Sequence, residues 1–340
     1  MKANQLKKLT TLLFLITQIS SLPSCASIPQ NNSVATNKGS GAIAQGNQYA
    51  RDGLLREAVD SYKQALSKEP ENMTAHRNLG IVLVKAGDFI NAATHLEKSM
   101  TSFDDNYDAN FYLAEAYRAV DNYAEAIFRY KSALKIQKDD AKCLKSLAWS
   151  YYKTRYYTEA LNISQKLLIS SPNDDQVPII VARVYLRLKR ENDALLLIRK
   201  TMSRASTSSQ PYYQSVAAEV LHAKGSTTEA LATYRQALKS QPMLAGALLG
   251  IGRILLEQGK VNDAADSLER AIRVKPKLFE AHYYLGRALE GSNPQRALRY
   301  FAYFKKNASA DPELLDLIQD TRKRIGLITT NNAKIDPILN

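Results

Sequence analysis

The stretch GNQYARDGLLREAVDSYKQALSKEP, residues 46–70, contains the spacing that decides the fold of this 340-residue chain. Gly46 stands twelve residues before Ala58, and Pro70 stands twelve residues after it. The alanine of this stretch recurs at spacings of 34, 34, 34, 34, 36, 34 and 33 residues, at Ala58, Ala92, Ala126, Ala160, Ala194, Ala230, Ala264 and Ala297. An internal period of this length predicts stacked units that share a continuous core, not one compact globule.

Two further markers follow the same period. Small residues precede the recurring alanines by eleven or twelve positions, and prolines close several units. Small residues allow two helices to approach closely, and proline ends a helix because it lacks an N–H group and clashes with the preceding turn. The small residues are Gly46, Gly80, Ala114, Ala148, Ala182, Ala218, Gly252 and Gly286, and the prolines are Pro70, Pro172, Pro242 and Pro276.

Together these markers resemble the tetratricopeptide repeat, over about residues 39–310. The resemblance implies an all-α fold, a right-handed superhelical solenoid of about eight helix–turn–helix repeats with a C-terminal capping helix. We predict repeats 1–5 at residues 39–208, an insertion at 209–210 where the solenoid bends, and repeats 6–8 at 211–310. A capping helix at 311–325 and a loose tail at 326–340 complete the predicted organisation.

The first 24 residues have the features of a secretory signal peptide. Lys2, Lys7 and Lys8 precede an apolar stretch from Leu9 to Leu22, which is shorter than the ~20 apolar residues of a membrane span. The run Leu22-Pro23-Ser24-Cys25 resembles a bacterial lipobox, which implies that Cys25 becomes lipidated. Residues 25–38 would then be a flexible tether.

The lipobox resemblance also predicts a location. It implies the bacterial cell envelope, and Ala26 in place of an aspartate favours an outer-membrane lipoprotein that faces the periplasm. Cleavage after Ala26, which would give a secreted or soluble periplasmic protein, is the alternative.

The chain is basic, with 46 Lys and Arg against 33 Asp and Glu. Such a surplus favours anionic partners. No nucleic-acid-binding motif accompanies the charge, so we expect protein or peptide partners, acidic ones among them. The lipid on Cys25 would add a contact with the membrane.

Residue patterns for catalysis are absent from the sequence. The histidines His76, His95, His222 and His282 are scattered, and no phosphate loop or nucleophile elbow accompanies them. The acidic pairs Asp104-Asp105, Asp139-Asp140 and Asp174-Asp175 recur where first helices begin, which favours helix capping over catalysis. We therefore predict that the protein is not an enzyme and uses no cofactor, metal or small-molecule substrate.

Concave-face positions carry the candidate binding residues. In the family that the sequence resembles, positions 2, 5, 9 and 12 of each first helix face the groove. Aromatic and Arg side chains there are the types that anchor interfaces, although Trp149 could instead pack between helices. The predicted groove residues are Asn47, Arg77, Phe111, Glu115, Lys145, Trp149, Tyr152, Arg183, Tyr212, Glu219, Arg253, Tyr283 and Arg287.

A basic concentration lies within residues 176–210. It is either a patch for an acidic partner or a lipid surface, or the solvated outer face of a degenerate repeat. Its members are Arg183, Arg187, Lys189, Arg190, Arg199, Lys200 and Arg204.

These features predict a scaffold tethered to the envelope, which binds partner segments in its groove during assembly of a pilus, secretion or outer-membrane complex. A regulatory subunit of a polysaccharide-export machine, or an adaptor for peptidoglycan enzymes, is the alternative.

Overall fold

A computed structural model describes residues 39–100, 106–308 and 311–335. Within these ranges the chain forms 17 α-helices, one 3-10 turn and no strand. The predicted signal peptide, Cys25 and the tether lie outside the described residues, as does the pair Asp104-Asp105.

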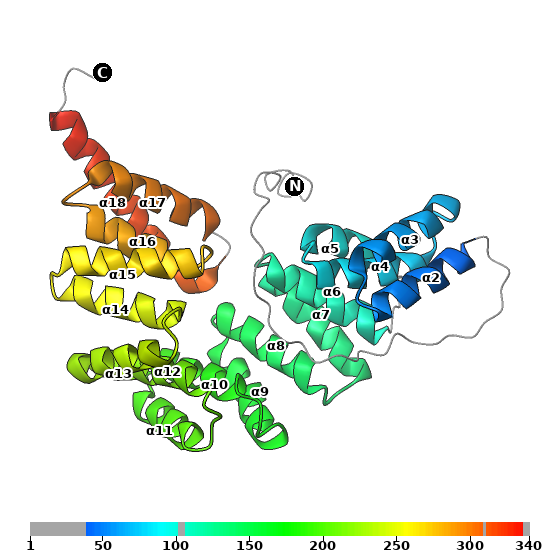
Figure 1. Cartoon of the computed structure of the whole chain (residues 1–340), viewed down its shortest axis with the longest axis horizontal. Coiled ribbons are helices and arrows are strands. Elements are labelled where there is room, and N and C mark those ends of the chain that lie inside the picture. The colour runs from blue at the N-terminus through cyan, green and yellow to red at the C-terminus, as the bar shows by residue number, and fades with distance from the viewer. Residues whose placement is uncertain (1–38, 101–105, 309–310, 336–340) are drawn as a thin grey trace.

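Helices α2 to α17 form eight consecutive pairs, which Figure 1 shows stacked along an arc. The first helices of the pairs are α2 (Ser40–Arg51), α4 (Met73–Ala86), α6 (Tyr107–Ala119), α8 (Ala141–Lys153), α10 (Val177–Arg187), α12 (Gln210–Ala223), α14 (Ala245–Glu257) and α16 (Phe279–Leu289). The second helices are α3 (Leu55–Lys68), α5 (Phe89–Lys98), α7 (Tyr123–Ile136), α9 (Tyr157–Ser170), α11 (Glu191–Met202), α13 (Thr227–Ser240), α15 (Val261–Val274) and α17 (Pro294–Asn307). The predicted all-α solenoid of eight helix pairs is confirmed.

Small residues sit where the two helices of a pair touch. An ideal Cβ built on Gly80 would lie 2.5 Å from the Cγ atom of Leu96 on the partner helix. The recurring alanine Ala92 is fully buried at the same contact. Successive first helices, for example α6 with α8 and α8 with α10, also contact each other, so the core continues from one pair to the next.

Polar caps begin several first helices, and one of them, Asp140, belongs to a predicted acidic pair. The side chain of Asp140 accepts a hydrogen bond from the backbone N–H of Cys143 at 2.6 Å at the start of α8. Asp174 accepts from the N–H of Gln176 at 2.9 Å, just before α10. Asp140 thus satisfies a backbone donor that α8 leaves unpaired at its start, whereas Asp174 closes a turn just before α10, whose N-cap residue Gln176 makes no side-chain cap.

The insertion predicted at 209–210 does not separate two blocks. Gln210 is the first residue of α12, and the side chain of Ser209 donates a hydrogen bond to Asp175. One hydrophobic cluster runs from Ala182 to Ala264, across this point. Tyr213 of α12 keeps the inter-repeat packing intact here, because it is buried and its hydroxyl donates to the carbonyl oxygen of Asp175 at 2.9 Å.

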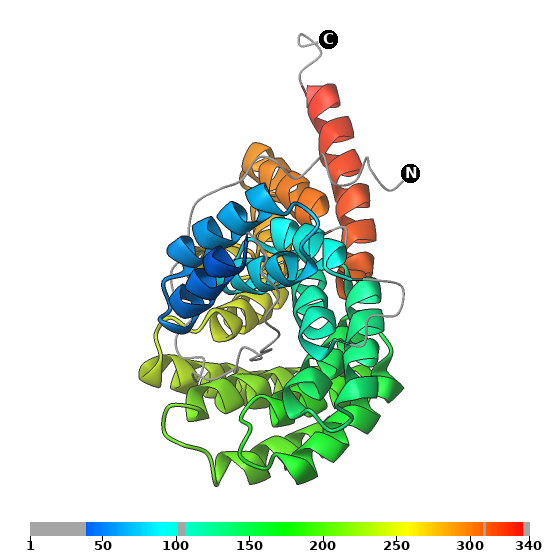
Figure 2. The same cartoon turned by 90° about the vertical axis from the view of Figure 1, so that its right-hand side faces the viewer.

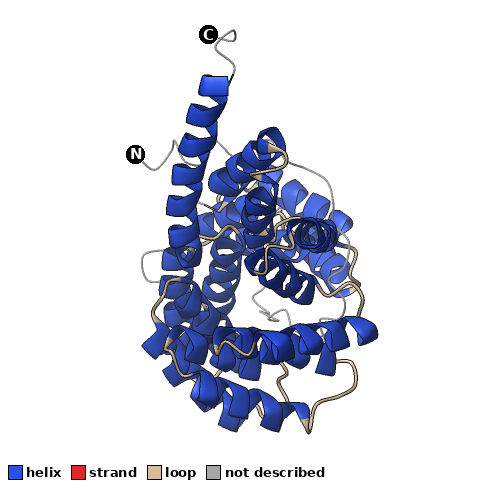
Figure 3. Ribbon diagram, turned by 90° about the vertical axis from the view of Figure 1, so that its left-hand side faces the viewer, coloured by secondary structure: helices blue, strands red, loops and turns tan. Residues whose placement is uncertain are grey.

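The C-terminal cap is longer than predicted. After the 3-10 turn η1 (Pro312–Leu314), helix α18 runs over Leu315–Ile335, so the loose tail predicted from residue 326 is wrong as far as residue 335. The reason is that apolar residues continue at helical spacing, and Ile318 and Ile328 are both buried in the C-terminal core. Figure 3 shows that the distal part of α18 projects beyond the repeats.

No helix within the described ranges is both long and apolar enough to cross a bilayer.

Candidate functional site on the concave face

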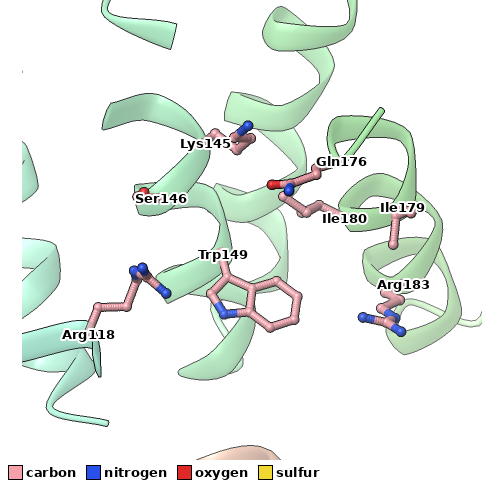
Figure 4. Close-up of a pocket in the computed structure, with 8 residues that line it drawn as sticks. All are labelled: Arg118, Lys145, Ser146, Trp149, Gln176, Ile179, Ile180 and Arg183. Atoms are coloured by element: carbon pink, nitrogen blue, oxygen red, sulfur yellow. The ribbon is translucent and has the colours of Figure 1, made fainter. Parts of the chain in front are cut away.

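A pocket of about 310 Å³ opens between three first helices, α6, α8 and α10. Figure 4 shows that its lining combines cationic groups, an indole ring and aliphatic side chains. The lining residues are Arg118, Lys145, Ser146, Trp149, Gln176, Ile179, Ile180 and Arg183.

Trp149 lies at the centre of this lining and is half-buried. Its ring stacks on that of Tyr152, with centroids 5.3 Å apart and planes inclined by 30°. The indole ring also packs against the hydrophobic cluster of repeats 3–5. Both interpretations of Trp149 therefore hold in part, because one side of the residue packs on the core and the other lines the pocket.

Each pocket cation is matched by a carboxylate that lies outside the lining. Two of these pairs join different repeats. The closest contacts are 2.5 Å for Arg118–Glu115, 2.6 Å for Lys145–Asp174 and 3.5 Å for Arg183–Glu219. The pocket lining therefore presents three cationic side chains and no carboxylate. The carboxylates that pair with these cations, Glu115, Asp174 and Glu219, are not part of the lining.

Among these three carboxylates, Glu115 accepts hydrogen bonds from the most side chains. It accepts hydrogen bonds from the hydroxyl of Tyr130 at 2.5 Å and from that of Ser146 at 2.7 Å, besides its pair with Arg118. Burial alone would raise the pKa of Glu115, but the Arg118 charge and these hydrogen bonds hold it below its ordinary value. Glu115 is thus an ionised anchor that joins α6, α7 and α8.

Family comparisons agree with this architecture. Models of the tetratricopeptide repeat match residues 83–150, 215–277 and 249–312, and a TPR repeat model matches residues 46–87. The chain belongs to the tetratricopeptide repeat family. A further family model, which describes subunit 3 of the anaphase-promoting complex, or cyclosome, matches residues 120–201.

Similar solved structures include a tetratricopeptide repeat protein from Parabacteroides merdae and yeast Tom70. The first has a TM-score of 0.65 at 17% identity and covers 74% of this chain and 98% of its own. Tom70 has a TM-score of 0.60 at 18% identity and covers 92% of this chain and 69% of its own. At these identities the likeness establishes the fold alone.

Among curated proteins, the BBSome complex member BBS4 homolog of Drosophila melanogaster is 34% identical over 86 residues. The match covers 25% of this chain and 18% of that protein, so the chain spans less than a fifth of its relative's length. Tetratricopeptide repeat proteins are in general non-enzymatic scaffolds. Among the described residues, no three His, Cys, Asp or Glu side chains gather where they could hold a metal ion.

Several predicted groove residues of this repeat protein meet at or beside the pocket. Lys145, Trp149 and Arg183 line it, and Glu115 and Glu219 hold its arginines.

Other predicted groove residues lie in neighbouring repeats. Asn47 accepts hydrogen bonds from Tyr62 at 2.7 Å and from Asn78 at 2.8 Å. Arg253 stacks over the ring of Tyr284 at 5.1 Å. Arg77 and Arg287 are half-buried, and Tyr212 is exposed and accepts a hydrogen bond from Gln241 at 2.9 Å. The pocket brings none of these residues together.

Three predicted groove residues belong to the core instead. Phe111 and Tyr283 are each 3% exposed and Tyr152 is 6% exposed. Phe111 packs against Tyr107 and Tyr130, with ring centroids 5.8 and 6.1 Å apart. The prediction was wrong at these sites because large rings at groove-facing positions bend back to fill the gap between adjacent helices.

Five pocket residues were absent from the prediction, namely Arg118, Ser146, Gln176, Ile179 and Ile180. Helical spacing could have found two of them, because Arg118 stands three residues after Glu115 and Ser146 stands three residues before Trp149. Ile179 and Ile180 stand four and three residues before Arg183, but in the sequence an aliphatic residue on a first helix is indistinguishable from core.

The predicted basic patch is divided by the fold. Arg183 and Arg187 are on α10 and form ion pairs with Glu219 and Glu313. Arg199, on the second helix α11, instead pairs with a glutamate of α13 at 3.4 Å. The remaining members are exposed at the turn after α10, on α11 or in the loop after it: Lys189, Arg190, Lys200 and Arg204. The seven residues therefore do not form one patch.

Cys143 does not contribute to the site. It is fully buried, and burial raises the pKa of its thiol to about 12. The thiol donates to the carbonyl oxygen of Tyr130 at 3.6 Å, so it is a packing residue.

Proposed function

We propose that this chain is a non-enzymatic scaffold that binds a segment of a partner protein on its concave face, at the pocket around Trp149. The observation that carries the proposal is a half-buried indole ring in a pocket whose lining includes three cationic side chains. Tryptophan and arginine in a partly desolvated pocket are the residue types that carry most of the binding energy in protein interfaces.

The lining favours a particular kind of segment. Trp149, Ile179 and Ile180 offer contact to an apolar or aromatic side chain. Arg118, Lys145 and Arg183 favour a carboxylate beside it. An acidic segment with one large apolar residue fits this combination.

The decisive experiment compares capture by two aromatic variants. Trp149→Ala removes the pocket ring, whereas Phe128→Ala removes a 58% exposed ring on the second helix α7. Wild-type and variant proteins are used to capture partners from detergent-solubilised bacterial envelopes, and mass spectrometry quantifies each partner. We expect Trp149→Ala to lose the specific partner and Phe128→Ala to retain it. Equal capture by both variants would overturn the proposal.

We also propose that a lipid on Cys25 tethers the scaffold to the bacterial envelope, facing the periplasm from the outer membrane. The lipobox-like run Leu22–Cys25 supports this, together with the basic and apolar residues before it. Growth with an alkyne-tagged palmitate should label the wild-type chain and not Cys25→Ser, which should also leave the membrane fraction. An unlabelled wild-type chain would instead support plain secretion.

The pathway follows from the captured partner. A pilus, secretion or outer-membrane assembly component would support the first proposal made from sequence. A polysaccharide-export component or a peptidoglycan enzyme would support the alternative.

A further inference from the structure

The turn that begins the C-terminal cap reaches back to the middle of the solenoid. We call residues Asp311–Asp316 the acidic turn; they include η1 and the first two residues of α18. Its hydrogen bonds with the middle repeats join residues that are between 126 and 161 positions apart in the sequence. Figure 2 shows the start of α18 beside the helices of the middle repeats.

The acidic turn forms ion pairs and hydrogen bonds with residues of repeats 4 and 5. Asp311 forms an ion pair with Lys153. The carboxylate of Glu313 accepts a hydrogen bond from the Tyr157 hydroxyl at 2.5 Å, and its other oxygen accepts from Nε of Arg187 at 2.7 Å.

Arg155 completes the contact at the C-terminal end of the turn. It donates to the Asp316 carboxylate at 3.1 Å and to the carbonyl oxygen of Glu313 at 3.5 Å. Four residues receive the acidic turn, and we call them the acceptor surface, although their side chains are the hydrogen-bond donors: Lys153, Arg155, Tyr157 and Arg187.

Burial shows that these carboxylates are the centre of the contact. The side chains of Glu313 and Asp311 are only 5% and 9% exposed. A carboxylate that loses its water needs charged or hydrogen-bonding partners, and the acceptor surface supplies them. The surface therefore recognises two carboxylates two residues apart.

The apolar contacts of the cap lie elsewhere. Leu314, Ile318 and Ile328 belong to a hydrophobic cluster whose other members all come from repeats 6 to 8 and the end of α17. The contacts described above between the acidic turn and repeats 4 and 5 are ion pairs and hydrogen bonds. The carboxylate side chains of Asp311, Glu313 and Asp316 can therefore leave the acceptor surface while Leu314 and α18 stay packed on the C-terminal repeats.

The acceptor surface lies beside the pocket, because Arg187 follows the pocket residue Arg183 by one turn of α10. The guanidinium group of Arg187 lies 5.7 Å from the centre of the Tyr152 ring, and that ring stacks on Trp149. A segment bound to the acceptor surface would thus extend towards the Trp149 pocket.

We propose that the acidic turn is an internal ligand of the acceptor surface, and that an acidic segment of the partner protein displaces it. This inference rests on the proposed function, in that it takes the concave face as the partner-binding side. Because the internal ligand is covalently attached, it competes at a high effective concentration and weakens the binding of any acidic segment in trans.

The probe is a fluorescein-labelled peptide of residues 311–320, DPELLDLIQD, and its binding to the purified full-length chain is measured by anisotropy. The release variant Asp311→Asn/Glu313→Gln removes both buried charges of the acidic turn. A second variant adds Lys153→Gln/Arg187→Gln to remove the acceptor surface. Glu290→Gln is the matched control, because Glu290 pairs at 2.6 Å with Arg324 of α18, away from the acidic turn.

We expect the release variant to bind the peptide about tenfold more tightly than wild type, as for a site that is about nine-tenths occupied by its internal ligand. The added acceptor-surface substitutions should abolish this binding, and Glu290→Gln should behave as wild type. A peptide in which Asn and Gln replace the three carboxylates Asp311, Glu313 and Asp316 should not bind the release variant. If the double substitution impairs folding, as judged by circular dichroism, the single variants carry the same test with intermediate effects.

Equal affinity for wild type and the release variant, or no peptide binding to the release variant, would overturn the inference. If either result occurs while partner capture still depends on Trp149, the inference fails and the proposed function stands. If capture is also independent of Trp149, both fail.

Discussion

Gly250 of α14 and Tyr234 of α13 touch so closely that an ideal Cβ on Gly250 would lie 2.1 Å from Cζ of the tyrosine ring. Tyr234 is 3% exposed, so the ring has no free space into which it could move. We expect Gly250→Ala to lower the free energy of unfolding by about 1–3 kcal/mol through overpacking. Urea denaturation followed by circular dichroism measures this loss.

Gly246 provides a control on the same helix. A Cβ at this position would meet only the Ser215 hydroxyl, at 3.5 Å, which is an ordinary contact. Gly246→Ala should therefore leave stability unchanged or raise it by ~0.5–1 kcal/mol, because alanine favours the helix. Equal destabilisation by both substitutions would show that helix α14, and not the contact with Tyr234, responds.

A capping substitution tests the interpretation of the paired aspartates. Asp140→Ala removes the side chain that accepts from the backbone N–H of Cys143 and should cost about 1 kcal/mol. Asp139→Ala changes an exposed neighbour of the same charge and should cost much less. Thermal denaturation of the two variants compares them directly, and a larger loss with Asp139→Ala would contradict the capping role.

Replacing Glu115 by Gln should destabilise the protein at neutral pH by about 1.5–3 kcal/mol, since it removes the charge that Arg118, Tyr130 and Ser146 stabilise. The pKa of Glu115 is lowered in the folded state, so its stabilisation is complete above the unfolded value of about 4.3. It is lost as the pH falls through the lower folded value. The gap between wild type and Glu115→Gln, measured by thermal denaturation, should therefore narrow in acid. A gap that stays constant down to pH 3 would contradict an ionised Glu115, and the exposed Glu159→Gln on α9 is the control.

The rings of His76 on α4 and His95 on α5 form a hydrogen-bonded pair. Nε2 of His76 lies 2.8 Å from the carbonyl oxygen of Pro70 and therefore carries its proton, which leaves Nδ1 as an acceptor 2.9 Å from Nδ1 of His95. Burial lowers the pKa of His95, and the His76 ring, Lys98 and Lys63 lower it further against the opposing charge of Asp88. Protonation of His95 would leave its Nδ1–H bonded to His76, but it would place a charge in a half-buried site beside Lys98 and Lys63.

Stability should consequently fall as the pH drops below about 6.5, the unfolded value for histidine, because the unfolded chain then binds more protons than the folded one. Thermal denaturation at pH 7.5 and pH 5.5 measures the change. His95→Gln removes the titrating ring and should flatten the profile over this range. A variant that loses as much stability as wild type would assign the effect to other groups.

Much of the fold could be predicted from residue spacing. The recurring alanines lie in second helices, and the small residues lie in first helices, as the contact of Gly80 with Leu96 illustrates. Sequence spacing succeeds here because each repeat contacts mainly its neighbours, so local pattern and global structure agree. It failed at residues 326–335, where the polar run from Thr329 to Asn332 hides a helix that continues the buried spacing of Ile318 and Ile328.

The candidate site was predictable only in part. Trp149 and Arg183 were found because they occupy groove positions, but the same rule selected Phe111 and Tyr283, whose rings turn into the core. A position on a helix fixes the direction in which a side chain leaves the backbone. It does not fix whether a neighbouring helix leaves room for the ring.

The sequence by itself determined the period, the helix pairs and the close contacts within each pair, because these depend on residues less than about one repeat apart. Only the tertiary structure decided that Glu313 meets Tyr157 and Arg187, since that contact depends on the accumulated curvature of the intervening repeats. Small rotations between successive repeats add along the solenoid, and no local pattern records their sum.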